Sequence, residues 1–289
     1  MDADKRSINP DHGGDENDGG AKANDNEEDE TGPVDEEDVV SHVFLPKTRR
    51  TSFFFSFTHL NFVLTERGYP LTAVELAVVF RQPDFHELIR QFLYDQAHLR
   101  DLDAPLGMDV PLAQCPPFNS RISVYHCMTA VFYSPSDPSG LRGMRRESIR
   151  SNPIWRGYLP RHDTVFIERD PTLPGIRGCD VVRLLALFSF VWKEESYPCA
   201  LVRWFTYVAD EPDKVTGMWV VRPDYNADGS PAIGIIHLDS VLRAAHLIPV
   251  FGDNPMPIAS ELRPENSLDV FRAFYINRYI DYHAFEITS

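Results

Sequence analysis

The sequence has few cysteines and no apolar run long enough to cross a bilayer. Its four cysteines form no Cys-x-x-Cys pair, which argues against a disulfide framework or a zinc site, and we expect buried thiols. The most apolar stretch, 181–192, is interrupted by Arg183 and is shorter than the roughly 18 residues that a spanning helix needs. With no secretory or mitochondrial leader at residues 1–18, we predict an intracellular protein without a membrane partner.

Recognisable catalytic motifs are also missing. Neither GxGxxG nor GxxxxGK[ST] occurs, and there is no G-x-S-x-G elbow, HExxH helix or complete EF-hand loop. His246 and His283 could each act as a base, although a hydrogen-bonded structural histidine is the competing interpretation. Aspartates are abundant, but no spacing selects a catalytic pair. We therefore predict no enzyme activity, no catalytic residue, no metal and no cofactor.

Negative charge is concentrated at one end of the chain. The formal charge of the whole chain is -15, and residues 1–40, with 15 acidic and 3 basic side chains, account for -12 of it. All 34 aromatic residues come later, so this end has too little apolar surface to fold. We predict a disordered acidic tail over residues 1–42. It is either a solubilising tail or a decoy for a basic partner or for the chain's own basic stretch.

Residues 43–120 are expected to form a helical and extended segment that packs on the body. KTRR at 47–50 could belong to a nuclear-import signal, and the phenylalanines at 53–57 suit a buried extended segment. Apolar spacing predicts helices over 71–80 and 84–96. The side chains expected in the core are Leu71, Val74, Val78, Phe85, Leu88, Phe92 and Tyr94.

Residues 121–289 are predicted to be a β-rich domain. Strands are expected over 122–133, 164–167, 181–192, 198–208, 218–221 and 232–237, separated by short turns such as 224–230. Helical spacing of aromatic residues predicts a long helix over 267–284. The predicted fold class is α+β, a small antiparallel barrel or sandwich flanked by an N-terminal helical pair and a long C-terminal helix.

Residues 139–161 carry the only strong positive charge. Six arginines face the single acid Glu147, with Trp155 and Tyr158 between them. Arginine makes bidentate contacts with phosphate and stacks on rings, so the cluster suits nucleic acid or an acidic peptide. Internal ion pairs, or contact with the acidic tail, are the alternative. The candidate nucleic-acid-binding residues are Arg142, Arg145, Arg146, Arg150, Arg156 and Arg161.

Several strings together suggest a family. They are SVYHCMTAVFYSPSDPSGLRGMRRESIRSNPIWRGYLPRHDTVFIERD at 123–170, HLDSVLRAAHLIPVFG at 237–252 and SLDVFRAFYINRYIDYHAFE at 267–286. Over about residues 70–289 the chain resembles the C-terminal part of transposase-like proteins of mushroom-forming fungi, of the Plavaka and Kyakuja-Dileera-Zisupton kind. The resemblance implies a mobile-element-derived protein that works on or near DNA in the nucleus. The nuclease core of such proteins lies upstream of the matched part, so no catalytic residue is carried over.

A weaker resemblance concerns the order of the predicted strands. PRHDTVFIERD at 160–170, ALVRWF at 200–205 and the string at 237–250 are similar to the element order of bromo-adjacent homology domains, which are chromatin modules built on a β-barrel. That resemblance implies a peptide site, for which Trp204, Tyr207 and Trp219 are candidates. Ordinary core aromatics are the competing interpretation.

These observations favour a non-catalytic nucleic-acid-binding or chromatin-associated module in the nucleus, with DNA or chromatin as its partner. The alternative is a protein-interaction module that binds a histone tail or a transposase subunit. A metal-dependent nuclease would need clustered carboxylates, and the sequence shows no order among its acids.

Overall fold

The computed structural model describes residues 59–62, 65–99, 101, 103–134, 143–157, 159–251 and 262–289. The predicted acidic tail, the KTRR and phenylalanine segment, Arg142 and Tyr158 lie outside these residues. No helix in the described ranges is long and apolar enough to span a membrane.

A long β-hairpin forms the spine of the molecule. It consists of β7 (Cys179–Trp192) and β8 (Glu195–Tyr207), paired along their length with one irregularity between Leu184 and Ala186. On one side of this irregularity the hairpin pairs with β6 (Thr164–Glu168) and β9 (Val220–Pro223). On the other side it pairs with β2 (Ile122–Tyr125), and β10 (Ile233–His237) pairs with β8 across the irregularity. A bulge increases the local bend of a strand, which allows one hairpin to join two groups of partners.

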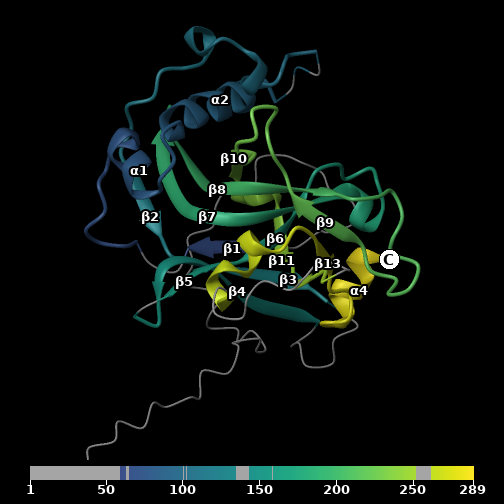
Figure 1. Cartoon of the computed structure of the whole chain (residues 1–289). Helices are drawn as coiled ribbons and strands as arrows, with labels where there is room; N and C mark the ends of the chain where they lie inside the picture. The colour runs from purple at the N-terminus through teal and green to yellow at the C-terminus, as the bar shows by residue number, and fades with distance from the viewer. Residues whose placement is uncertain are drawn as a thin grey trace, which may run out of the picture.

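The main sheet is antiparallel and curled into a half-barrel (Figure 1). Its strand order is β11 (Val241–Ala244), β6, β7, β8, β9, β13 (Phe274–Ile276) and β12 (Leu247–Pro249), with β2 and β10 attached to the spine. The predicted strands at 164–167, 181–192, 198–208 and 232–237 are confirmed within a residue or two at most ends. The β-rich antiparallel architecture is therefore confirmed in the form of a curled sheet.

A second sheet has the order β1 (His59–Phe62), β3 (Cys127–Tyr133), β4 (Met144–Trp155) and β5 (Leu159–His162). Strand β4 carries three of the six clustered arginines, and these charges prevented its recognition as a strand from the sequence. Its odd-numbered residues lie opposite Phe132, Ala130 and Met128, which are all buried. Because alternate residues of a strand point to opposite faces, the odd positions from Arg145 to Ser151 face the core and the even positions face outward. A register shift between Asn152 and Trp155 ends this alternation, and Trp155 contacts Arg150 and Arg161 of the outer face.

Two helices lie within the segments predicted to be helical, α1 (Ala73–Val79) and α2 (Phe85–Ala97). In α2 the predicted core residues Phe85 and Phe92 are buried, and Leu88 and Tyr94 are half-buried. In α1 the predicted core face is wrong. Leu71, Val74 and Val78 are 46%, 68% and 79% exposed.

The face of α1 that packs on the body consists of Ala73, Leu76 and Ala77. These positions have the same helical spacing as the predicted set, so periodicity alone could not select between the two faces. Smaller alanines let the helix approach the core through Leu76, which is fully buried. Two short 3-10 helices, η1 (Gly107–Asp109) and η2 (Leu112–Gln114), lie between α2 and β2.

The predicted long C-terminal helix is wrong. The chain instead forms η5 (Pro264–Asn266), the short α3 (Ser267–Val270), strand β13 and α4 (Tyr282–Thr288). Phe274 and Ile276 are buried because β13 pairs with β9 and β12. Two residues separated by one position point to the same face of a strand, whereas in a helix they would point to different faces. Asp281 then starts α4 by accepting a hydrogen bond from the Ala284 N–H.

Three buried apolar clusters support this arrangement. The first joins α1 and α2 to β7 and β8, the second lies between the two sheets, and the third lies under the C-terminal segment. The four cysteines are free thiols. Cys115, Cys179 and Cys199 are buried as predicted, and Cys127 is half-buried.

Candidate nucleic-acid interface

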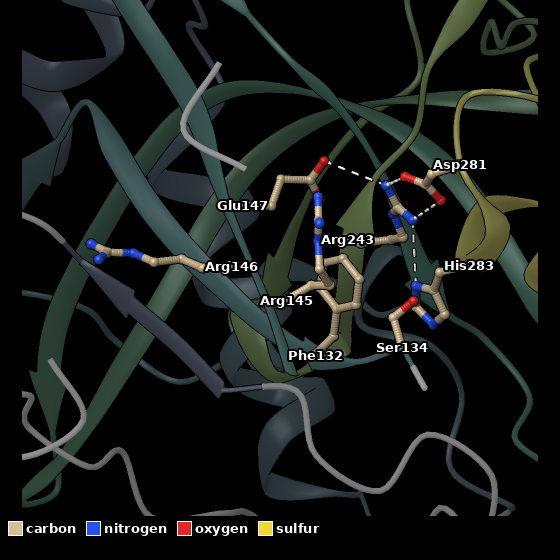
Figure 2. A pocket seen from close by; sticks show the side chains of 8 residues that line it. All are labelled: Phe132, Ser134, Arg145, Arg146, Glu147, Arg243, Asp281 and His283. Carbon is tan, nitrogen blue, oxygen red and sulfur yellow. Dashed lines mark hydrogen bonds and ion pairs between the residues drawn. The ribbon is translucent and has the colours of Figure 1, made fainter. Parts of the chain in front are cut away.

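A buried arginine fixes the inner side of the arginine-bearing sheet to the C-terminal segment. Arg243, on β11, is 4% exposed and donates two hydrogen bonds to the Asp281 carboxylate, at 2.8 and 2.7 Å. Glu147, on β4, approaches the same guanidinium to 3.6 Å and accepts a hydrogen bond from the Ala244 N–H. Figure 2 shows these groups converging, with Phe132 beside Arg243. The only acid among the clustered arginines is thereby turned inward.

Burial governs the protonation of this group. Desolvation raises the pKa of Glu147, against the opposing effect of the Arg243 charge. Desolvation alone would also raise the pKa of Asp281, but the hydrogen bonds and charge of Arg243 outweigh it and hold that pKa below its ordinary value. His283 stacks on Phe132 with ring centroids 4.6 Å apart, and burial beside Arg243 lowers its pKa to about 4. His283 is therefore neutral at physiological pH.

The hollow at this cluster is too small for a substrate. It encloses about 10 Å³, which is close to the room needed for one water molecule. The Ser134 hydroxyl, buried beside it, has no hydrogen-bond partner among the described residues. Since Asp281 and Glu147 already receive hydrogen bonds and His283 is enclosed, the arrangement is suited to holding the C-terminal segment against β4 and β11.

A second buried arginine makes an equivalent contact. Arg183 and Arg203 face each other on β7 and β8, and Asp269 of α3 bridges them at 2.9 and 3.1 Å. Next to Arg183, the ring of His162 accepts or donates a 3.0 Å hydrogen bond with the buried Ser151 hydroxyl. Burial and then the Arg183 charge lower the pKa of His162. We name these two contacts, Arg243–Asp281 and Arg183–Asp269–Arg203, the C-terminal clasps.

The outer face of the β4–β5 hairpin is different. Arg146 and Arg150 occupy even positions of β4, and Arg161 pairs with Asn152 on the same face. In Figure 2 the Arg146 side chain points away from Arg243 and His283. Arg156 lies in the exposed turn, with φ 51° before Gly157. We name the set Arg146, Arg150, Trp155, Arg156 and Arg161 the arginine track.

Trp155 is the centre of the track. The guanidinium carbons of Arg150, Arg161 and Arg156 lie 4.6, 5.4 and 6.0 Å from its ring centroid. All three fall within the range of cation–π attraction, which holds like charges together on one surface. Arg161 also donates a hydrogen bond to the Asp163 carboxylate at 2.8 Å and forms an ion pair with it.

The six predicted arginines are thus divided between two faces. Arg146, Arg150, Arg156 and Arg161 share the outer face and the turn, and Arg145 lies on the inner face beside the Arg243 cluster. Arg142 is outside the described residues. Only strand alternation could have separated Arg145 from the others, and that signal requires β4 to be recognised first.

The three aromatics predicted for a peptide site do not come together. Tyr207 and Trp219 are in contact in the third core cluster, where the Tyr207 hydroxyl donates to the Cys179 carbonyl at 3.0 Å. Trp204 lies on the opposite face of β8, against the second cluster. Burial and nearby charges raise the pKa of Tyr207 far above its ordinary range, as expected of a core phenol.

Other candidate residues give no further site. His246 is exposed and contacts the Asn277 amide at 3.3 Å. His126 contacts the Tyr69 hydroxyl at 2.8 Å, and burial lowers its pKa in spite of nearby Glu66. Across the described ranges, no group of three or more histidine, cysteine or acidic side chains is placed to hold a metal ion.

Comparisons with known proteins leave the identity open. No family model, no curated protein and no solved structure matches this chain. The geometry of the arginine track is therefore the main guide to function.

Proposed function

We propose that this protein is a non-catalytic nucleic-acid-binding or chromatin-associated module, derived from a fungal transposable element, that contacts phosphates through the arginine track. The observation that carries the proposal is the grouping of Arg150, Arg156 and Arg161 around Trp155 on the outer face of one hairpin. The resemblance of residues 70–289 to transposase-like proteins supports the same kind of partner and a place in the nucleus.

The shape of the hairpin suits a duplex. A two-stranded β-ribbon fits the major groove of B-DNA, which is roughly 12 Å wide. The turn is the exposed part of the β4–β5 ribbon, and Ile154 beside it is 63% exposed. Guanidinium groups that already contact the Trp155 ring are oriented before binding, so less side-chain entropy is lost when they contact phosphate.

The charge arrangement favours backbone contacts over base reading. Glu147, the only acid within residues 139–161, approaches Arg243 on the inner side, and Asp163 pairs with Arg161 on the outer face. We therefore expect affinity that depends strongly on salt and weakly on sequence, because each phosphate neutralised adds about 0.9 to the slope of log K against log salt.

The test is a titration of the full chain with a duplex of about 20 base pairs at two salt concentrations. We expect micromolar binding at low salt, within the usual range of non-specific complexes, and a steep loss at higher salt. A variant with Arg146→Gln, Arg150→Gln and Arg156→Gln should bind more weakly, and its salt slope should be flatter by about three.

The matched control removes three arginines from elsewhere on the surface. Arg67, Arg222 and Arg272 are exposed and lie outside the track. Changing all three to glutamine alters the net charge equally, so a general charge effect would reduce binding in both variants. Equal losses in both variants, or no binding by the unmodified chain, would reject the proposal.

A further inference from the structure

We propose that the acidic block at residues 25–38 binds the arginine track within the same chain and competes there with nucleic acid. This inference rests on the proposed function for the identity of the competitor, but the contact itself does not require it. Residues 25–38 contain nine acidic side chains and no basic one, so their charge is opposite to that of the track.

The register of the second sheet places the entry of the N-terminal chain close to the track. His59, the first residue of β1, lies opposite Val131 of β3, and Val131 lies opposite Arg146 of β4. Neighbouring strands are about 4.8 Å apart, so the backbone at His59 is roughly 10 Å from the backbone at Arg146. The chain that carries the acidic block therefore reaches the folded body beside one end of the track.

The lengths also match. From Arg146 to Trp155 the track follows β4 for nine residues, which corresponds to roughly 30 Å at about 3.3 Å per residue. Fourteen extended residues span at most about 50 Å, so the acidic block can cover the whole track. Residues 39–58 join the block to β1, and a connection of that length can span up to roughly 70 Å, which is enough to bring the block to any part of the track.

Tethering makes a weak contact effective. A covalent connection of this length sets a local concentration on the order of millimolar. If the free acidic segment binds the arginines with a dissociation constant near 100 μM, the track is occupied about nine-tenths of the time, and the apparent affinity for DNA falls about tenfold. Because the attraction is between opposite charges, the effect should fade with added salt.

A measurement without nucleic acid tests the contact directly. The four tryptophans give separate indole N–H signals in a ¹H–¹⁵N spectrum of the full chain, and a Trp155→Phe variant identifies that of Trp155. In a second full chain the nine acidic residues of 25–38 are changed to asparagine or glutamine. We expect the Trp155 signal to shift in that variant and the signals of Trp192, Trp204 and Trp219 to stay in place.

The matched control neutralises the six acidic residues within 1–18 and leaves 25–38 unchanged. It should leave the Trp155 signal in place. An unchanged Trp155 signal in the 25–38 variant overturns the inference, and an equal shift in the control overturns its assignment to this block.

Duplex binding by the same three proteins then separates this inference from the proposed function. Neutralising 25–38 should tighten binding about tenfold at low salt and by less at high salt, and a synthetic peptide of residues 25–38 added in excess should reverse the gain. A shift of Trp155 with no DNA binding by any variant supports the contact and rejects the proposed function. DNA binding that is equal in all three proteins rejects the competition.

Discussion

Arg243 and Arg150 make the same contact with an aromatic ring in opposite surroundings. Arg243 lies 4.9 Å from the Phe132 ring, is almost fully buried and is held by the Asp281 carboxylate. Arg150 lies 4.6 Å from the Trp155 ring on the outer face, and within the described ranges no carboxylate pairs with its guanidinium. A buried guanidinium needs a carboxylate to offset desolvation, whereas an exposed one can remain available for a ligand.

Arginine therefore has two separate roles in this protein. The C-terminal clasps attach residues 262–289 to the sheets, and the arginine track presents charge to solvent. Substitutions should therefore affect stability at the clasps and binding at the track.

The largest effect is expected from Asp281→Asn. Asparagine can still cap α4, but it leaves the buried charge of Arg243 without its main partner. Loss of one member of a buried pair typically costs about 3–5 kcal/mol, and we expect the lower half of that range because Glu147 remains nearby. Urea unfolding followed by tryptophan fluorescence measures it.

Asp210→Asn is the control for this change, since Asp210 is exposed. Its free energy of unfolding should stay within about 0.5 kcal/mol of the parent. An equally small loss for Asp281→Asn would show that the buried charge of Arg243 does not depend on the Asp281 carboxylate.

Asp269→Asn should have a smaller effect, about 2 kcal/mol. The change leaves Arg183 and Arg203 facing each other across β7 and β8 without their shared carboxylate. The Asp269 side chain is 46% exposed, so water can replace part of what is lost. A loss larger than that of Asp281→Asn, in the same unfolding measurement, would reverse the predicted order of the clasps.

Acid should weaken the Arg243 clasp. The folded-state pKa of His283 is about 4, below its ordinary value near 6.5, so between these values the unfolded chain binds the proton and stability falls as the pH is lowered. The lowered pKa of Asp281 acts in the same direction at lower pH, and the raised pKa of Glu147 acts in the opposite one.

We expect a loss of about 1–2 kcal/mol from His283 between pH 7 and pH 5. Unfolding at the two pH values should show that His283→Gln removes most of this difference, whereas His246→Gln, at an exposed position, does not. A pH dependence that is unchanged in His283→Gln would show that the buried histidine is not its source.

The smallest effect on stability is expected from Arg150→Gln. Its cation–π contact with Trp155 is at the surface and is worth about 0.5–1 kcal/mol at most. The same change should weaken duplex binding and flatten its salt slope by about one. If the free energy of unfolding falls by more than about 2 kcal/mol, Arg150 is a structural arginine like Arg243, and the distinction between clasp and track is wrong.

The sequence was informative where local signals agree with the fold. Apolar runs rich in β-branched and aromatic residues predicted the spine strands. The predicted turn at 224–230 forms with Gly229 at φ 84° and a hydrogen bond from the Asn226 N–H to the Ser230 carbonyl. It failed for β4, because a strand with arginines on both faces lacks the usual alternation. It failed again at 267–284, where sheet pairing overrode a helical spacing of aromatics.

The sequence predicted only part of the candidate site. Composition identified the excess of arginine at 139–161, because charge can be counted without a fold. Whether those arginines face each other, the core or solvent depends on strand alternation and on the position of Trp155 at the hairpin turn. Neither is visible in the order of residues alone.

By itself the sequence determined the strongly acidic first 40 residues, the antiparallel β-rich body and the local excess of arginine, since these follow from composition and short-range patterning. Only the tertiary structure decided which arginines are structural. Asp281 and Asp269 are far from Arg243 and Arg183 in the sequence, and the pairing of distant strands brings each carboxylate to a buried guanidinium that must be neutralised. The arginines on the outer face are left to surround Trp155.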